Sequence, residues 1–306
     1  MTKSTFEAVA EAQVSMEVAQ KITGRTELLA LIAYPIRHSD SPRMHNLALA
    51  KLGLDYAYLA FEVDAPDLED AIRALRVLKV RGWNVSMPNK MEVIKYLDHI
   101  STAAELIGAC NTIVNDNGVL RGENTDGLGY MAALREQGVE TRDKKITLIG
   151  AGGAAMAIAT QAALDGVASI HIFNRRDDFF AKGEANAAKI SEKTNAKVSL
   201  HDLDDLETFH ACVKDSAVLA NATNVGFKGK LEGLSPLPDP GVLRPDLFVT
   251  DSIYAPRKTK FLEQAEAAGC RTMNGIPMML HQGAAAFKMW TGNDMPLDYV
   301  KDHLFA

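Results

Sequence analysis

The chain has 306 residues, of which 47% are hydrophobic and 24% charged, and its formal net charge is −6 at pH 7. These values are typical of a soluble globular protein, and the length allows about two domains at roughly 100–200 residues each. The acidic balance, without a basic block, argues against nucleic acid or an anionic membrane as the main partner. No apolar run approaches the roughly 18 residues that span a bilayer.

The sequence indicates no disulfide framework and no metal site. The three cysteines, Cys110, Cys212 and Cys270, are far apart and show no Cys-x-x-Cys spacing. A reducing cytoplasm is therefore the expected location. His38 and His45 have no third ligand at metal spacing, so we expect no metal.

The first half of the chain alternates between β-type and amphipathic segments. Residues 1–22 have the pattern of a modest amphipathic helix, and their scattered acidic residues without a long apolar core exclude a signal peptide. Strand–helix alternation predicts parallel sheets with helices on both faces. We expect strands at 28–34, 55–63 and 83–86, with helices at 41–53, 67–79 and from Pro88 to about 97.

A hairpin and a second alternating series follow. The turn Asn115-Asp116-Asn117-Gly118 between two β-type runs predicts the hairpin. The Pro/Gly-rich segment 231–245 is expected to be a loop, since a helix or strand through it would be costly. After Asp126 we expect strands at 144–150, 169–174, 197–202, 216–223 and 247–254, with helices at 153–165, 277–291 and 297–305.

The segment ITLIGAGGAAMAIA carries a dinucleotide-binding fingerprint. A predicted strand ends in Gly150-Ala151-Gly152-Gly153-Ala154-Ala155, and a predicted helix follows. The first glycine allows a tight turn, the second lets the backbone approach a pyrophosphate, and Ala155 takes the third, packing position. The phosphates would then lie on the helix N-terminus. A glycine-rich turn without any ligand is the alternative.

The end of the next strand bears on the choice of cofactor. It reads Asn174-Arg175-Arg176-Asp177. An acidic residue here would accept the ribose hydroxyls of NAD, whereas an arginine would favour the phosphate of NADP. Asp177 could equally be the N-cap of the next helix. We expect NAD as the preferred cofactor and leave NADP open.

Lys90 stands at an unusual place. With Pro88 at the start of a predicted helix, Lys90 would fall in its first turn, where the helix dipole disfavours cations. Dipole and partial burial would lower the pKa of Lys90, and a nearby carboxylate would raise it, so the balance stays open. A solvated surface lysine is the plainer interpretation.

Polar residues elsewhere suit a small hydroxylated acid. Ser41 and Pro42 form a predicted N-cap and N1 pair, and a helix N-terminus with the hydroxyls of Ser39 and Ser41 is a natural carboxylate site. Polar clusters at Asn111-Thr112 and Asn124-Thr125-Asp126 suit a polyhydroxylated ligand. Turn and cap chemistry is the alternative for the second cluster.

Eight motifs in order resemble the shikimate dehydrogenase family, and within it most closely the quinate/shikimate dehydrogenase branch. The resemblance runs from about residue 27 to the C-terminus. Its motifs are PIRHSDSPRMHN, GWNVSMPNK, GACNTI, GENTDGLG, GAGGA, NATNVGF, DSIYAP and GIPMMLHQGAAAF.

The resemblance implies a role for individual residues. Lys90 and Asp126 match the catalytic lysine–aspartate pair. Residues that match substrate-binding positions are Ser39, Ser41, Tyr58, Ser86, Asn111, Tyr254 and Gln282. Residues that match cofactor-binding positions are Gly150, Ala151, Gly152, Gly153, Ala154, Asn174, Arg175, Arg176, Asp177, Thr223, Asn224, Ser252, Ile253 and Gly275. Asn224 departs from the serine or lysine frequent at its position, which leaves that contact open.

The implied fold is α/β with two domains. An N-terminal, mostly parallel α/β substrate domain (23–126 plus 276–306) and a Rossmann-type NAD(P)-binding domain (127–275) would enclose a cleft, preceded by an extension at 1–22. The implied activity interconverts shikimate with 3-dehydroshikimate, and quinate with 3-dehydroquinate. A homodimer is left open.

Three alternatives stay open. The first is a strictly biosynthetic NADP-dependent shikimate dehydrogenase. The second is a two-domain dehydrogenase that acts on a folate or an amino acid. The third is a non-catalytic sensor of shikimate or nucleotide, against which the presence of both Lys90 and Asp126 argues.

Overall fold

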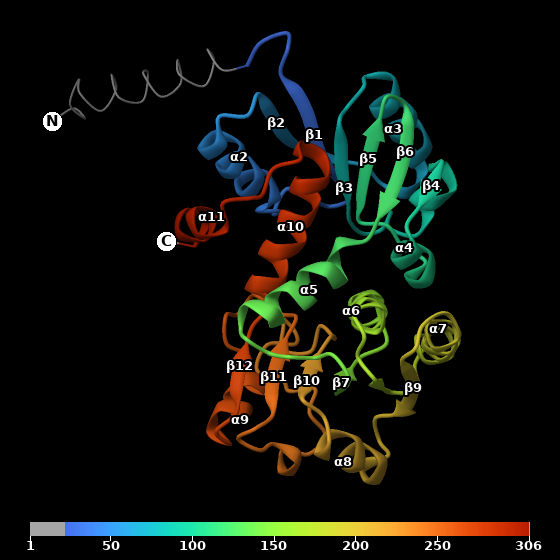
Figure 1. Cartoon of the computed structure of the whole chain (residues 1–306), viewed down its shortest axis with the longest axis vertical. Coiled ribbons are helices and arrows are strands. Elements are labelled where there is room, and N and C mark those ends of the chain that lie inside the picture. The colour runs from blue at the N-terminus through green and yellow to red at the C-terminus, as the bar shows by residue number, and fades with distance from the viewer. Residues whose placement is uncertain (1–21, 306) are drawn as a thin grey trace, which may run out of the picture. The chain divides into compact units, whose positions relative to one another are not determined.

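The structure, a computed structural model, describes residues 22–305 (Figure 1). The helix expected over residues 1–22 lies almost entirely outside this range. The chain divides into two compact units. The first comprises residues up to Asp98, Thr112–Arg121 and Phe287 onward, and the second comprises His99–Asn111 and Gly122–Ala286. The domain boundaries implied by the family resemblance stay a prediction.

The first sheet is mixed and six-stranded, in the order β2-β1-β3-β5-β6-β4. Its strands are β1 (Glu27–Ala33), β2 (Tyr56–Glu62), β3 (Gly82–Val85), β4 (His99–Ile100), β5 (Thr112–Asp116) and β6 (Val119–Glu123). β1 pairs in parallel with β2 and β3, whereas β3 pairs antiparallel with β5. The predicted hairpin is confirmed, because β5 and β6 are neighbours and Asn117 and Gly118 both have positive φ, as a tight hairpin turn requires.

A close approach of backbone and aromatic ring organises the core of the first unit. A Cβ on Gly82 of β3 would lie 2.2 Å from the indole nitrogen of Trp290, so only glycine leaves room for that ring. The indole N–H of Trp290 donates to the carbonyl of Ile113 at 2.9 Å. Leu29 and Met44 are also buried in this unit.

The helix predicted from Pro88 to about residue 97 is wrong. Residues 87–91 form a turn, and only a short 3₁₀ helix, η2 (Glu92–Tyr96), follows. The buried amide of Asn89 donates to the carbonyl of Val63 at 2.8 Å, which holds the turn to a distant strand end. Apolar periodicity predicted a helix here, but the tertiary contact favours a turn. Lys90 therefore lies in a turn, and the helix-dipole argument does not apply to it.

The second sheet is wholly parallel and confirms the predicted Rossmann topology. Its order is β12-β11-β10-β7-β8-β9, which numbered along the chain is 3-2-1-4-5-6 from the β9 edge. Its strands are β7 (Lys145–Ile149), β8 (Ser169–Asn174), β9 (Lys197–Asp202), β10 (Val218–Asn221), β11 (Phe248–Asp251) and β12 (Arg271–Met273).

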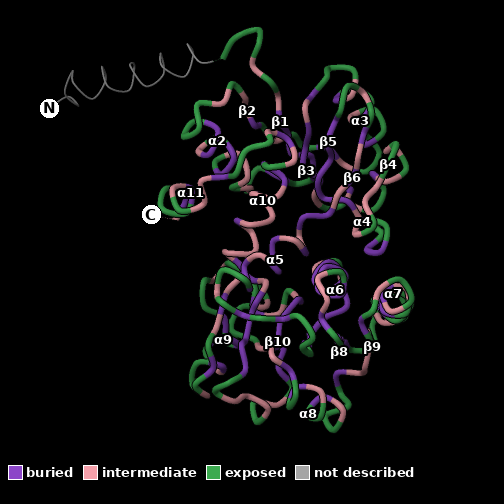
Figure 2. Tube along the Cα trace, in the orientation of Figure 1, coloured by how far each residue is buried: buried purple, intermediate pink, exposed green. Residues whose placement is uncertain are grey.

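Alternating side chains bury both faces of this sheet. Ile146 and Ile170 belong to one hydrophobic cluster, whereas Ile149 and Phe173 belong to another. Figure 2 shows helix α6 buried along most of its length, as its alanine-rich sequence permits. Because both faces of the sheet are covered, its strands consist of nearly continuous apolar residues.

Helices and short 3₁₀ helices connect the strands of the two sheets. They are η1 (Ala65–Asp67), α2 (Ser41–Leu52), α3 (Leu68–Val77), α4 (Thr102–Ile107), α5 (Thr125–Glu136), α6 (Gly153–Leu164), α7 (Phe180–Lys193), α8 (Leu206–Lys214), η3 (Pro240–Val242), α9 (Lys260–Ala267), α10 (Ile276–Thr291) and α11 (Leu297–Leu304). The segment 231–245 is a loop with a single 3₁₀ turn, as predicted. No helix within residues 22–305 combines the length and apolar character needed to cross a membrane.

Candidate functional site

The glycine turn between β7 and α6 has the geometry that a dinucleotide requires. Gly150 has a φ of +112°, and a Cβ there would lie 2.8 Å from Cγ2 of Thr223. Gly152 is the N-cap of α6 and has no side-chain cap, and a Cβ on Gly152 or Gly153 would meet nothing within 4 Å. The space beside these two glycines is open, as the approach of a pyrophosphate to the N-terminus of α6 requires. Ala155 is fully buried, as the packing position requires.

Asn174, at the end of β8, links this turn to the next loop. Its side-chain oxygen accepts from the amide of Ala151 at 3.1 Å, and its side-chain nitrogen donates to Asp177 at 2.8 Å. The same Asp177 oxygen accepts from the amide of Phe179 at 2.9 Å. Since the N-cap of α7 is Phe179, Asp177 supports the entry to the helix without being its cap.

The two adjacent arginines have different surroundings. Arg176 donates to Asp202 at 2.6 Å, and its guanidinium lies 4.8 Å from the ring centroid of Phe180. The side chain of Arg175 is exposed and has no hydrogen-bond or ion-pair partner within the described residues 22–305. Arg175 is therefore the cation of this loop that a ligand phosphate could engage without breaking an ion pair.

A buried carboxylate network follows strands β10 and β11. Asp251 accepts from Asn221 at 3.0 Å, from the amide of Ile253 at 3.0 Å and from Thr259 at 2.6 Å. Asn221 also accepts from the amide and the hydroxyl of Thr223. Burial raises the pKa of Asp251 to about 6 despite these hydrogen bonds. The network fixes the loops that carry Thr223 and Ile253.

Sequence reasoning did not select Asn221 and Asp251 for the site. The available signal was their position, because each is a polar residue at the carboxyl end of a buried parallel strand, where α/β sheets place ligands. Gly275 belongs to the same region. Its amide donates to the carbonyl of Ile253 at 2.9 Å, and a Cβ on it would lie 2.2 Å from the carbonyl oxygen of Ser252. Asn224 is exposed beside them.

Asn111, Asp126 and Gln282 converge at the N-terminus of α5. The amide of Asn111 donates to Asp126 at 2.8 Å and to the hydroxyl of Thr125 at 3.0 Å, and that hydroxyl lies 3.4 Å from Gln282. Asn124 caps α5 by accepting from the amide of Asp126, so cap chemistry is confirmed for Asn124. Asp126 itself lies in the first helical turn, where the dipole stabilises a carboxylate.

Gly129 allows Gln282 to come so near to α5. A Cβ on Gly129 would lie 2.5 Å from the amide nitrogen of Gln282 and 2.7 Å from the carbonyl of Met278. The sequence motif GENTDGLG contains this glycine, but no local rule shows that it faces another helix. The requirement follows only from the contact between α5 and α10.

Lys90, Ser86 and the two serines lie in the first unit. Lys90 and Ser86 are intermediate in exposure, so Lys90 is not a fully solvated surface lysine. Ser39 accepts from the amide of Ser41 at 3.2 Å. The predicted N-cap is one residue late, since the N-cap of α2 is Asp40 and Ser41 is its first helical residue. Lys90 belongs to the first unit and Asp126 to the second.

The two tyrosines differ sharply in their surroundings. Tyr58 has no exposed surface, stacks on His45 with ring centroids 4.4 Å apart, and donates to the side chain of Asn84 at 2.7 Å. That arrangement favours a packing role for Tyr58. Tyr254 is 42% exposed and packs edge-on against Phe227.

Comparisons with known proteins agree with this fold and these motifs. A family model described as "Shikimate dehydrogenase substrate binding domain" matches residues 31–113, and one described as "Shikimate 5'-dehydrogenase C-terminal domain" matches residues 275–305. The protein of Listeria innocua named shikimate dehydrogenase (NADP(+)) is 56% identical over 289 residues, covering 94% of this chain and 99% of that protein.

Solved structures show the same likeness. The crystal structure of shikimate 5-dehydrogenase from Listeria monocytogenes in complex with shikimate and NAD has 56% sequence identity and a TM-score of 0.91, covering 93% of this chain and 98% of that chain. Quinate dehydrogenase from Corynebacterium glutamicum in complex with NAD has 26% identity and a TM-score of 0.81, covering 92% and 98%. Identity above half over nearly the full length shows that this chain belongs to the shikimate dehydrogenase family.

Proposed function

We propose that the protein interconverts shikimate and 3-dehydroshikimate with NADP as its preferred cofactor. The observation that carries the proposal is the 56% identity, over 94% of the chain, to a relative named shikimate dehydrogenase (NADP(+)). The proposal adopts the biosynthetic alternative of the sequence interpretation in place of the NAD-preferring, quinate-oxidising one. The open N-terminus of α6 supports a dinucleotide of either kind.

The loop after β8 supports NADP. Arg175 is exposed and has no ion-pair partner in residues 22–305, so a phosphate on the adenosine ribose could pair with it. The Asp177 oxygen that meets Asn174 and Phe179 already accepts two hydrogen bonds, which ties this carboxylate to the entry of α7.

When bound, NADP would accept the hydride that leaves the alcohol carbon of shikimate, and the protein must remove the hydroxyl proton. We assign that proton transfer to Lys90 and Asp126, because one acid–base group can serve both directions of the reaction. The amide of Asn111 donates to Asp126 at 2.8 Å, which fixes the orientation of this carboxylate. Asp126 would accept a hydrogen bond from a substrate hydroxyl.

The remaining polar residues suit the other groups of shikimate. The hydroxyls of Ser39 and Ser41 at the start of α2 would hold the carboxylate, since a helix N-terminus favours an anion. Asn111 and Gln282 would bind ring hydroxyls from their positions beside Thr125. Ser86 and Tyr254 are the further contacts we assign, whereas Tyr58 supports the fold from the core.

A second candidate keeps NAD as cofactor and adds quinate as substrate. The Listeria monocytogenes relative was solved with shikimate and NAD, and the acidic residue Asp177 stands where NAD-binding proteins contact ribose hydroxyls. The candidate differs from the first in two measurable ratios, NAD against NADP and shikimate against quinate.

One spectrophotometric assay separates the candidates. NAD and NADP are each combined with shikimate and with quinate, and reduction of the nicotinamide is followed. We expect kcat/KM for shikimate to be about tenfold or more higher with NADP than with NAD, as one charge-assisted contact provides. A preference for NAD with quinate as a good substrate would replace the proposal by the second candidate. No turnover in any combination would leave the sensor alternative.

A further inference from the structure

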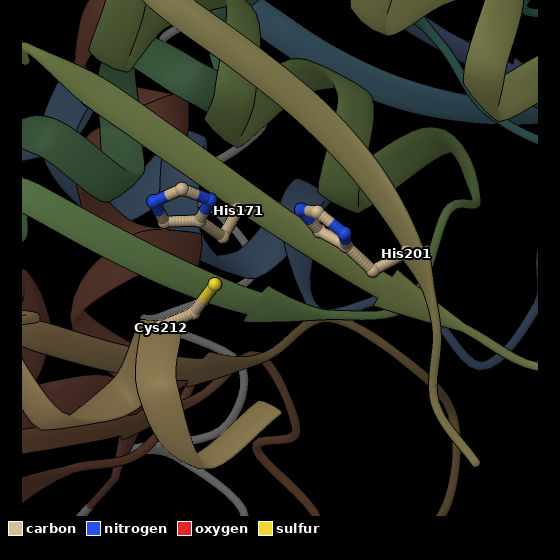
Figure 3. A group of neighbouring side chains, drawn as sticks. All are labelled: His171, His201 and Cys212. Carbon is tan, nitrogen blue, oxygen red and sulfur yellow. The ribbon is translucent and has the colours of Figure 1, made fainter. Parts of the chain in front are cut away.

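Three metal-ligating side chains meet outside the residues assigned to the reaction. They are His171 on β8, His201 on β9 and Cys212 on α8 (Figure 3). One ligand atom from each lies within 4.8 Å of the others, and all three residues are intermediate in exposure. No sequence motif joins them, since 30 and 11 positions separate them (201 − 171 and 212 − 201).

The fold explains why they converge. β8 and β9 pair in parallel, with His171 opposite Ser199 and Phe173 opposite His201. Because side chains two residues apart share a face of a strand, all four lie on one face of the sheet. Helix α8 covers that face through the core residue Phe209, which brings Cys212 to the imidazoles.

A single hydroxyl already aligns the two imidazoles. The Ser199 oxygen lies 3.1 Å from Nδ1 of His171 and 2.7 Å from Nε2 of His201. Both rings therefore direct a nitrogen to one point, and Figure 3 shows the rings and the Cys212 sulfur turned toward one another. A surface pocket of 540 Å³ is lined in part by His171 and Ser199, though not by His201 or Cys212, so it opens His171 alone of the three ligands to solvent.

The donor set of two imidazoles and one thiolate suits Zn²⁺. Zinc–nitrogen bonds of about 2.0–2.1 Å and zinc–sulfur bonds of about 2.3 Å place tetrahedral ligands roughly 3.5 Å apart. The observed separations of up to 4.8 Å would have to shorten by about an ångström, which small side-chain rotations can supply. The Ser199 hydroxyl or a water would take the fourth position.

Local electrostatics are compatible with a cation. Burial lowers the pKa of both histidines and raises the pKa of the Cys212 thiol. The negative charge of the Asp205 carboxylate opposes these effects at His201 and adds to them at Cys212, because it raises the pKa of both groups. The opposing charge is Lys145, which pairs with Asp215 at 3.2 Å.

We propose that His171, His201 and Cys212 bind a zinc ion that ties β8, β9 and α8 together. The site is separate from the residues assigned to substrate and cofactor, so its role is to stabilise the outer edge of the second sheet. Zinc would displace the thiol proton of Cys212, and its affinity would accordingly rise with pH.

Cobalt and zinc titrations of the full chain test the proposal. The protein, freed of any affinity tag and treated with a chelator, is titrated with Co²⁺, and a thiolate-to-cobalt charge-transfer band is expected that Zn²⁺ then abolishes. Cys212→Ser should lose the band and bind zinc at least about tenfold more weakly, as loss of a ligand predicts. Cys270→Ser is the matched control, because its sulfur contacts the carbonyl of Arg244 instead.

Thermal unfolding gives a second readout that does not depend on activity. Zinc should raise the Tm of the wild type and of Cys270→Ser, but not the Tm of Cys212→Ser. His171→Asn replaces Cys212→Ser if the latter does not fold, as judged by circular dichroism. The proposal would be overturned if the wild type gave no cobalt band. It would also be overturned if the band and the Tm shift persisted in Cys212→Ser and in His171→Asn.

Discussion

The glycine turn after β7 and the Lys90 turn after β3 are both strand-end segments assigned to the site, but different forces shape them. Gly150 adopts a backbone conformation with a φ of +112°, and the turn appears in the sequence as a strand, a glycine pattern and a helix. The Lys90 turn is held by Asn89, whose amide reaches the distant carbonyl of Val63. Local chemistry thus determines the first segment, and a long-range contact determines the second.

The largest expected effect is the fall in kcat when Lys90 is replaced. We expect Lys90→Ala to lower kcat by roughly 100- to 10,000-fold, as loss of a general acid–base group does. Cofactor binding, measured by fluorescence of NADPH, should be unchanged because the glycine turn belongs to the other unit. Lys95→Ala is the control, since Lys95 is exposed and paired with Glu92 in the same segment. Equal activity of both variants would remove Lys90 from the mechanism.

Two substitutions in the glycine turn separate its contribution to stability from its contribution to cofactor binding. Gly150→Ala should lower the free energy of unfolding by about 1–3 kcal/mol, since it places a Cβ at positive φ and against Thr223. Gly152→Ala should leave the Tm nearly unchanged, because its Cβ meets nothing within 4 Å, yet raise the KM for NADP. Denaturant unfolding and steady-state kinetics measure the two effects. A stable Gly150→Ala variant would show that this turn is not determined locally.

The first unit contains a buried histidine whose titration affects stability. His45 has no exposed surface, and neither ring nitrogen has a hydrogen-bond partner within residues 22–305. Burial lowers the pKa of His45 from 6.5 to about 3. The unfolded chain therefore binds the proton more readily, and stability is present above pH 6.5 and lost as pH falls toward 3.

We expect His45→Phe to reduce this pH dependence. Between pH 7 and pH 5 the free energy of unfolding of the wild type should fall by about 2 kcal/mol more than that of the variant, at 1.36 kcal/mol per pH unit below the unfolded pKa. Denaturant titrations at both pH values measure the difference. Parallel pH profiles would show that the His45 imidazole gains a proton in the folded core as readily as in the unfolded chain.

Removing the anchor of the Lys90 turn tests its dependence on tertiary contacts. Asn89→Ala deletes the hydrogen bond to Val63 and should cost about 1–3 kcal/mol of stability, with lower kcat and unchanged NADP binding. Glu92→Gln alters an exposed side chain of the same segment and serves as the control. A wild-type kcat in Asn89→Ala would mean that the turn keeps its shape without this bond.

The smallest expected effect concerns the cofactor phosphate. Arg175→Ala should raise the KM for NADP by about tenfold and leave the KM for NAD unchanged, as loss of one charge-assisted contact predicts. Arg176→Ala should change the KM for NADP and the KM for NAD by more similar factors, because Arg176 is paired with Asp202. Kinetics with both cofactors measure the ratio, and equal losses for NAD and NADP in Arg175→Ala would contradict the assignment.

Much of the fold was predictable because its signals are local. The glycine pattern, the Asn117-Gly118 hairpin turn and the strand–helix alternation each constrain a few consecutive residues. The segments that were missed or wrongly predicted lack such signals. β4 and β12 have only two and three residues, and the apolar periodicity after Pro88 resembles that of a helix although the segment is a turn followed by η2.

The sequence by itself determined the family, the Rossmann topology and the cofactor turn, because each depends on local conformation or on motif order. Only the tertiary structure decided which polar groups meet. It placed Asn111 against Asp126 and Thr125 against Gln282, joined Asn221 to Asp251, and brought Cys212 of α8 near His171 and His201 of the second sheet. Contacts between residues so far apart along the chain depend on how helices and strands pack, and no local pattern encodes that packing.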